Sequence, residues 1–184
     1  GGLSLPLGTG KTLISLCISL YNTIANNKSI LIIASKSLIS NWECEIKKFF
    51  GDELKYEIMH KSLSPKKDTK IILITIDTLA KIYHEHHIKE KFIKKLYIQE
   101  LGIYTNHYNE PINPFLNHEL GGGFIYSIKW GNIIVDEVQK FTNIDTLWCQ
   151  SLGALCSDYR WVLSGTIFDE PSINRIFGYY IIIN

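Results

Sequence analysis

The chain has 184 residues, which is enough for one domain with a sizeable hydrophobic core. Its apolar content of 46% and charged content of 20% are ordinary for a soluble globular protein. The formal net charge of +1 excludes a protein that binds nucleic acid through strong overall positive charge, although it leaves room for a local basic groove.

The first predicted element lies almost at the N-terminus. Leu3 to Leu7 is an apolar run that suits a short buried strand, and residues 13–20 suit a helix. Between them stands Gly8-Thr9-Gly10-Lys11-Thr12, and a glycine loop with Lys-Thr between a strand and a helix is typical of a phosphate-binding loop. Glycines let backbone N–H groups turn toward a phosphate, and the helix N-terminus adds partial positive charge.

We therefore predict a nucleotide site in this loop. Its cofactor-binding residues are expected to be Leu7, Gly8, Thr9, Gly10, Lys11 and Thr12. Lys11 would reach the β- and γ-phosphates, and Thr12 would be a ligand of Mg²⁺. The usual pattern G-x-x-x-x-G-K-[ST] has a glycine where this chain has Leu5, so an ordinary strand–helix turn remains the alternative.

A strand and a helix are predicted next. Residues 29–35 form an apolar, β-branched run that is typical of a fully buried parallel strand. A helix is expected to begin at Asn41, capped by Ser40, and to end at Gly51. Its core-facing stripe is predicted at positions i, i+4 and i+7, which are Trp42, Ile46 and Phe49.

Two more strands are expected at residues 56–60 and 70–75, with a polar loop between them and a helix from about Asp77 to Tyr83. Residues 84–128 show no clear periodicity and contain three consecutive glycines, so we interpret them as an insertion rather than as core. The histidines of this segment (His84, His86, His87) lack a second ligand cluster, and its lysines (Lys89, Lys91, Lys94, Lys95) are interpreted as a solvated face.

Regular structure is predicted to return at residues 132–136, a buried strand that ends in a carboxylate. A helix is expected at about residues 145–156, a strand at 159–163 and a helix at 172–180. The first of these helices is expected to turn Leu147, Ser151, Ala154 and Leu155 inward. Strands that alternate with helices along the whole chain predict an α/β fold with a mostly parallel sheet covered on both faces.

Asp136 and Glu137 follow that strand directly and indicate a second nucleotide motif. The aspartate would hold Mg²⁺, directly or through water, and the glutamate would orient or deprotonate the attacking water. Because ligands bind at the carboxyl ends of strands in such sheets, both motifs are expected on one rim. A solvated Asp-Glu pair at a strand end is the alternative.

Taken in order, these motifs resemble those of the Snf-type DNA translocases of helicase superfamily two. Motif I of that family, which also lacks the first loop glycine, is similar to residues 2–12. The later motifs are similar to residues 31–49 (with Leu38, Asn41, Trp42 and Glu45), 75–79, 133–143 and 160–170. The resemblance covers residues 1–83 and 129–178, and it departs from the family pattern at Gln139, Ile167 and Glu170, where His, Pro and Asn are usual.

The resemblance implies a RecA-like, three-layer αβα lobe of the P-loop NTPase class over residues 1–184, with an insertion at about 84–128. It implies ATP and Mg²⁺ as cofactors, and a catalytic set of Lys11, Asp136, Glu137 and Gln139 with Thr12 and Asp136 as metal ligands. The implied partners are double-stranded DNA and a second RecA-like lobe, which supplies an arginine finger. This chain is expected to lack that lobe and to hydrolyse ATP slowly by itself, because such an arginine is worth roughly 10³–10⁵ in rate.

Nucleic-acid contacts are expected from loops on one face of the lobe: Lys36, Thr75, Ser164, Gly165 and Thr166. Hydroxyls and backbone N–H groups at helix starts suit phosphate contacts, which position a duplex without reading its sequence. A solvated surface lysine is the alternative for Lys36.

Two other functions compete with a translocase. A degenerate, non-enzymatic lobe that serves as a nucleotide- or partner-binding scaffold remains open. A small-molecule kinase is disfavoured, because such enzymes need an arginine-rich lid and this chain has only Arg160 and Arg175.

The cysteines and the hydropathy indicate an intracellular protein. Cys17, Cys44, Cys149 and Cys156 show no C-x-x-C spacing, so we expect reduced and mostly buried thiols and no zinc site. No apolar run approaches the roughly 20 residues that cross a membrane. The Ile-, Lys- and Asn-rich composition suggests an AT-rich genome, and the genome of a virus is one example. The expected location is the nucleus or, for a viral protein, a viral factory or a virion.

Overall fold

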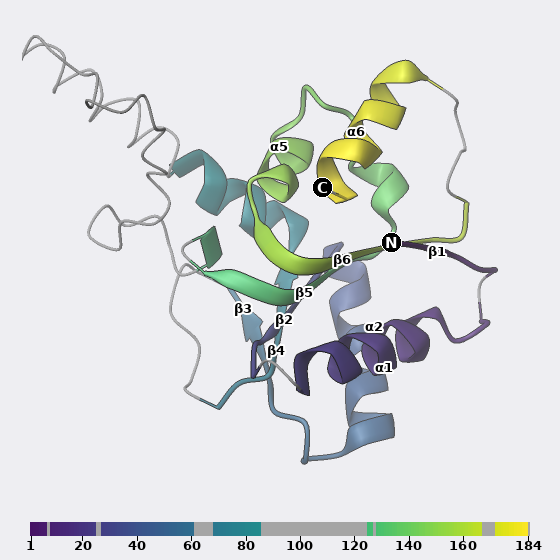
Figure 1. Cartoon of the computed structure of the whole chain (residues 1–184), viewed down its shortest axis with the longest axis vertical. Coiled ribbons are helices and arrows are strands. Elements are labelled where there is room, and N and C mark those ends of the chain that lie inside the picture. The colour runs from purple at the N-terminus through teal and green to yellow at the C-terminus, as the bar shows by residue number, and fades with distance from the viewer. Residues whose placement is uncertain are drawn as a thin grey trace, which may run out of the picture.

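The computed structural model describes residues 1–6, 8–24, 27–60, 68–85, 125–126, 128–166 and 172–183. Within them the chain forms one all-parallel sheet in the order β1-β6-β5-β2-β4-β3 (Figure 1). The strands are β1 (Gly2–Ser4), β2 (Ile30–Ala34), β3 (Tyr56–Met59), β4 (Ile71–Thr75), β5 (Lys129–Val135) and β6 (Cys156–Ser164). The α/β prediction is confirmed, and the sheet is parallel throughout.

Helices cover both faces of this sheet. They are α1 (Lys11–Ile24), α2 (Lys36–Phe50), a helix over residues 76–85, the short 3₁₀ helix η3 (Val138–Lys140), α5 (Leu147–Gly153) and α6 (Ile173–Ile183). Figure 1 shows α1 and α2 on one side of the sheet and α5 and α6 on the other. The predicted three-layer arrangement is therefore present.

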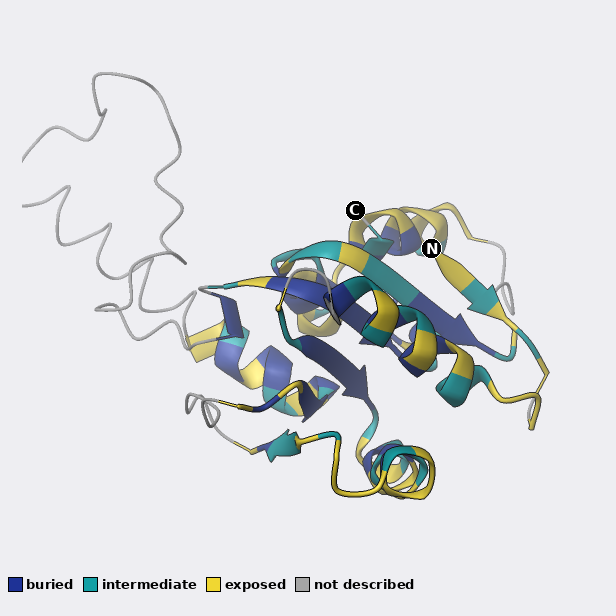
Figure 2. Ribbon diagram, turned by 60° about the horizontal axis from the view of Figure 1, so that its bottom comes forward, coloured by how far each residue is buried: buried dark blue, intermediate teal, exposed yellow. Residues whose placement is uncertain are grey.

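The pleat of β2 explains why there are two hydrophobic cores. Successive side chains of a strand point to opposite faces. Leu31 and Ile33 therefore pack with α5, α6 and the helix over 76–85, whereas Ile30, Ile32 and Ala34 pack with α1 and α2. All five residues are buried, and Figure 2 shows the central strands as a buried layer between more exposed helices. A uniformly apolar strand is what a parallel sheet covered on both faces requires.

The helix that follows β2 begins earlier than predicted. It starts at Lys36 with Ser35 in the N-cap position, so the prediction of a Ser40 cap and a start at Asn41 is wrong. The N–H of Leu38 bonds the carbonyl of Ser35 at 2.9 Å, which turns the chain into the helix directly after the strand. Gly51 ends the helix as predicted, with φ 56°.

The buried stripe of α2 is also shifted from the prediction. Trp42 and Ile46 are buried as expected, but Phe49 is 42% exposed. Ile39 is buried instead, because the earlier start of the helix brings another turn over the sheet, and Phe50 at the end of the helix packs against the same core. The ammonium of Lys48 lies 5.0 Å from the centroid of the Phe49 ring, which shields this exposed aromatic side chain.

Further boundaries differ from the prediction in the second half of the chain. β5 and β6 begin three residues earlier than expected, and α5 is shorter than the predicted 145–156. The extra strand length carries Lys129 and Asp158, whose charges form an ion pair at 2.7 Å. Leu147 is 42% exposed rather than inward, while Ser151 and Leu155 are buried as expected.

The structure bears out some of the other expectations from the sequence, contradicts one and does not describe the rest. The four cysteines are unpaired as predicted, but only Cys149 is buried, so the expectation of mostly buried thiols is wrong. No helix in the described part of the chain is long and apolar enough to cross a membrane. The histidines at positions 86 and 87, the lysines at 89–95 and nearly all of the predicted insertion lie outside the described residues. The single-lobe boundary of 1–184 stays a prediction.

Arg160 joins β6 to the ends of two helices. Its guanidinium donates to the carbonyl oxygens of Leu152 at 3.2 Å and of Ile182 at 3.0 Å, and also to that of Leu155. The last carbonyls of a helix have no partner within the helix, and a cation there is favoured by the helix dipole. The side chain of Arg160 thus donates hydrogen bonds to carbonyl groups at the C-terminal ends of both α5 and α6.

We expect Arg160→Met to lower the free energy of unfolding by roughly 3 kcal/mol, because several part-buried carbonyls lose a charged donor together. Arg160→Lys should recover part of the loss, since an ammonium keeps the charge but not the fork of donors. Urea unfolding followed by circular dichroism measures both variants. A methionine variant as stable as the wild type would contradict this role.

Candidate nucleotide site at the carboxyl edge of the sheet

The predicted site segments meet at one edge of the sheet because all strands are parallel. The loop with Gly8 and Gly10 follows β1, Asp136 follows β5, and Ser164 is the last residue of β6. The sheet order places β1, β6 and β5 side by side. The two nucleotide motifs predicted from the sequence therefore do lie on the same rim, as the rule for open α/β sheets requires.

The loop before α1 has the backbone that its glycines allow. Gly8 has φ 81° and Gly10 has φ 84°, in the left-handed region that favours glycine. Among the described residues, no atom lies within 4 Å of the place that a Cβ would take at either position. α1 begins at once, with the N–H of Ile14 bonded to the carbonyl of Gly10 at 3.0 Å. Leu7 lies outside the described residues.

Lys11 points along this loop toward β6. Its ammonium donates to the carbonyl oxygen of Leu5 at 2.8 Å, and it lies 3.7 Å from the point where a Cβ at Gly165 would stand. The hydroxyl of Thr9 donates to the carbonyl of Pro6 at 2.7 Å, which closes the turn. The ammonium group of Lys11 therefore lies where three segments meet: the glycine loop, the first turn of α1 and the segment after β6.

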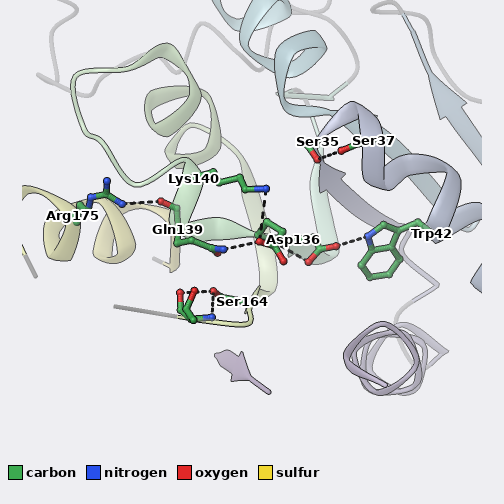
Figure 3. A network of polar contacts seen from close by, with 10 residues as sticks. Ser35, Ser37, Trp42, Asp136, Gln139, Lys140, Ser164 and Arg175 are labelled. Carbon is green, nitrogen blue, oxygen red and sulfur yellow. Dashed lines mark hydrogen bonds and ion pairs between the residues drawn. The ribbon is translucent and has the colours of Figure 1, made fainter. Parts of the chain in front are cut away.

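The Asp136 carboxylate is held at the end of β5 by two neutral donors. The backbone N–H of Glu137 donates to Oδ1 at 2.9 Å, and the indole Nε1–H of Trp42 donates to Oδ2 at 2.9 Å (Figure 3). Burial raises the pKa of Asp136, and the charge of Glu137 raises it further, whereas the Trp42 bond and the ammonium of Lys11 lower it. Burial is the largest of these influences, so the pKa of Asp136 is raised overall.

Glu137 and Gln139 form a second polar group beside Asp136. Glu137 adopts a left-handed backbone, with φ 52° and ψ 43°, which is uncommon for a residue with a side chain. Its Oε2 accepts a hydrogen bond from Nε2 of Gln139 at 2.6 Å and lies 3.9 Å from the ammonium of Lys140. The amide oxygen of Gln139 is buried and has no hydrogen-bond partner in the part of the chain that the structure describes.

This second group is tied to α6. Nη1 of Arg175 donates to the main-chain oxygen of Gln139 at 3.3 Å, as Figure 3 shows. Gly178 lies so close to the loop after η3 that a Cβ there would stand 1.7 Å from the carbonyl oxygen of Thr142. The position of Gln139 therefore depends on how α6 packs.

The side chains of this edge fit a magnesium ion that is shared with phosphates. Mg²⁺ prefers oxygen ligands and usually binds through one or two carboxylates together with substrate phosphates. Asp136 and Glu137 supply two neighbouring carboxylates, and Thr12 supplies a hydroxyl in the first turn of α1. Among the described residues, no group of three or more His, Cys, Asp or Glu side chains is placed to hold a metal without such help.

The structure brings together only some of the predicted nucleic-acid contacts. Lys36 lies two residues after β2, and Thr75 is the last residue of the adjacent strand β4, where it is paired with Ala34. Ser164, Gly165 and Thr166 lie beyond β5, next to Lys11. The predicted contacts therefore form two groups, one beside the nucleotide loop and one two strands away.

The hydroxyls of these residues already have local partners. Thr75 accepts from the N–H of Thr78 at 3.1 Å, and so caps the helix over 76–85. Ser164 accepts from the N–H of Thr166 at 3.0 Å. Lys36 is exposed at the first position of α2. Among the predicted nucleic-acid contacts, Lys36 is therefore the residue that presents a charged group to solvent, whereas the hydroxyls of Thr75 and Ser164 are bonded locally.

Sequence reasoning missed the contacts of Trp42 and Arg175 with this site. The sequence places Trp42 on the core-facing stripe and in a motif that resembles the family's, but assigns it no polar contact; a buried indole N–H needs an acceptor, and that requirement is the available signal. Arg175 carries no such signal, because its contact depends on the placement of α6.

Comparisons with known proteins point to one family. The sequence model of one protein family, the SNF2-related domain, matches residues 5–175. The chain is 29% identical over 181 residues to 172L, a protein of Invertebrate iridescent virus 6 that is named as a helicase, with 90% of this chain and 29% of that protein covered. It is 28% identical over 189 residues to an uncharacterized ATP-dependent helicase of Schizosaccharomyces pombe, with 100% of this chain and 16% of that protein covered.

A solved structure has the same fold. The SWI2/SNF2 ATPase core of Sulfolobus solfataricus in complex with double-stranded DNA superimposes with a TM-score of 0.68 at 22% identity. The match covers 100% of this chain and 31% of that one. The chain thus spans less than a third of the length of these relatives, and the likeness to the solved structure shows the RecA-like fold.

Proposed function

The chain belongs to the SNF2-related domain family, whose members use ATP, and on this premise we propose that it is the ATP-binding lobe of a translocase that couples ATP hydrolysis to movement on double-stranded DNA. The main support is geometric: the glycine loop after β1 and Asp136 after β5 lie on one rim of the sheet, on either side of β6, and the ammonium of Lys11 stands beside Gly165 at the end of β6. Two motifs far apart in the sequence thus face the same edge, as a site for Mg²⁺ and a nucleotide requires.

The residues of the site have distinct proposed roles. Lys11 and the N–H groups of residues 8–12 bind phosphate oxygens, and Thr12 and Asp136 hold the metal ion. A Mg²⁺ ion held there would offset the negative charge that develops on the phosphate oxygens. Glu137 orients the attacking water and accepts its proton, and Gln139 is held against Glu137 to report the nucleotide state.

The proposed partner is duplex DNA. The Sulfolobus solfataricus core is described with double-stranded DNA, and residues 8–12, 36 and 75 of this chain lie on the same edge of the same fold. Lys36, with the hydroxyl-rich start of α2, and Thr75 are proposed to contact DNA phosphates, whereas Ser164, Gly165 and Thr166 couple those contacts to Lys11. A second RecA-like lobe would complete the ATP site. We place the protein where its DNA lies, in a nucleus or at a site of viral replication.

We expect Lys11→Ala, in the full protein with both lobes, to weaken ATP binding about 10- to 100-fold and to abolish DNA-stimulated hydrolysis, because one charge-assisted contact to phosphate is lost. Phosphate release with and without duplex DNA measures the second effect. Lys129→Ala is the matched control, since it removes an exposed lysine from the opposite end of β5.

Two outcomes would contradict the proposal. Unchanged DNA-stimulated hydrolysis in Lys11→Ala would show that the loop is not the nucleotide site. A wild-type protein that shows no Mg²⁺-dependent ATP binding by calorimetry would favour a non-enzymatic scaffold lobe instead.

A further inference from the structure

Trp42 combines deep burial with a polar contact in the nucleotide site. Its side chain is 1% exposed and belongs to the core cluster that includes Ile39 and Ile46 of the same helix. Its indole N–H nevertheless reaches Oδ2 of Asp136, 94 residues further along the chain. Figure 3 shows the ring edge directed from α2 at the carboxylate.

We propose that Trp42 is a positioning residue that sets the orientation of the Asp136 carboxylate before the metal ion binds. This inference rests on the proposed function, because it assigns to Asp136 the role of metal ligand. The terminal torsion of an aspartate is broad, so the carboxylate turns unless both of its oxygens are held. The N–H of Glu137 holds Oδ1, and Trp42 holds Oδ2 from a different element of the fold.

The chemistry of an indole suits this role. The Trp42 N–H is a donor only, so it cannot replace an oxygen ligand of the metal. It is also neutral, and it leaves the full negative charge of Asp136 available to a cation, which a lysine or arginine in its place would offset. Groups that orient a metal ligand in this way are typically worth 10- to 100-fold in metal affinity.

The carboxylate keeps room for a ligand. An ionised carboxylate offers about four acceptor positions. In the described parts of the chain, hydrogen bonds from the indole of Trp42 and the N–H of Glu137 occupy one position on each oxygen. This leaves each oxygen a second acceptor position for a metal ion or for a water bound to it.

The test compares the wild-type protein with Trp42→Phe, a variant that keeps most of the apolar volume of the side chain but has no hydrogen-bond donor. We expect Mn²⁺, used as a probe for Mg²⁺, to bind about 10- to 100-fold more weakly in the presence of ADP, as measured by electron paramagnetic resonance. The affinity for ADP in EDTA, measured by calorimetry, should be unchanged. Trp161→Phe is the matched control, because the indole N–H of Trp161 is buried and has no hydrogen-bond partner among the described residues, so its loss removes no contact with Asp136.

A second measurement reports the contact itself and does not need a bound nucleotide. In ¹⁵N-labelled protein without metal, the indole N–H signal of Trp42 should be protected from solvent exchange, and Asp136→Ala should shift it and remove the protection. An unchanged signal in Asp136→Ala would overturn the inference, as would a folded Trp42→Phe protein with wild-type affinity for Mn²⁺. A wild-type protein that binds no ADP with or without metal would instead overturn the proposed function.

Discussion

Replacing Glu137 with glutamine is expected to slow ATP hydrolysis by about 10²- to 10⁴-fold, the range that a general base contributes, and to leave ATP binding intact. The amide has almost the shape of the carboxylate, but it cannot accept a proton from water. Its oxygen can still accept the hydrogen bond that Nε2 of Gln139 now donates at 2.6 Å. The variant should therefore trap the nucleotide-bound state rather than unfold the site.

The measurements for Glu137→Gln separate chemistry from binding. Single-turnover hydrolysis in the full protein reports the chemical step, and calorimetry with ATP and Mg²⁺ reports binding. Asp145→Asn is the matched control, since it removes an exposed carboxylate eight residues further along the chain. A Glu137→Gln protein that hydrolyses ATP at the wild-type rate would exclude Glu137 as the base.

Gly178→Ala is expected to have the largest effect on stability, a loss of about 3 kcal/mol or more in the free energy of unfolding. The added Cβ would stand 1.7 Å from the carbonyl oxygen and 2.5 Å from the carbonyl carbon of Thr142. Both atoms are backbone, so α6 must move away from the loop after η3. The gain of about 1 kcal/mol in helix propensity cannot offset this clash.

Gly153→Ala offers a close comparison for Gly178→Ala. It also adds a methyl group to a helical glycine, but the nearest atom, at 2.5 Å, is Cγ2 of the half-exposed Ile181 side chain, and the nearest backbone atom, the carbonyl oxygen of Ile181, is 3.7 Å away. Urea unfolding should therefore show a much smaller loss for Gly153→Ala. Equal losses in the two variants would contradict the close contact of α6 with Thr142.

The sequence predicts the centre of this fold well because burial there is uniform. β2 and β4 are unbroken apolar runs, and their boundaries agree with the prediction to within about one residue, closer than element boundaries usually are. The starts of β5 and β6 were missed because they contain Lys129 and Asp158, which look like loop residues until their ion pair is known. Local composition cannot reveal a charge that a distant partner satisfies.

In the candidate site, too, some features carry a local sequence signal and others depend on a distant partner. Lys11 and Asp136 could be placed from the sequence, because a strand that ends in a loop or a carboxylate carries its own local signal. The contact of Trp42 with Asp136 spans 94 residues, and that of Arg175 with Gln139 spans 36. Neither follows from periodicity, because both depend on which helix crosses which strand end.

The pairing of β1 with β6 has a consequence for the order in which the protein is made. β1 lies at the edge of the sheet and pairs with β6, and the backbone nitrogen of Gly1 bonds the carbonyl of Arg160, 159 residues later. At a synthesis rate of roughly 5–20 residues per second, β1 waits on the order of ten seconds for its partner strand to leave the ribosome. The glycine loop, joined to β1, therefore cannot reach its final position until β6 has been synthesised.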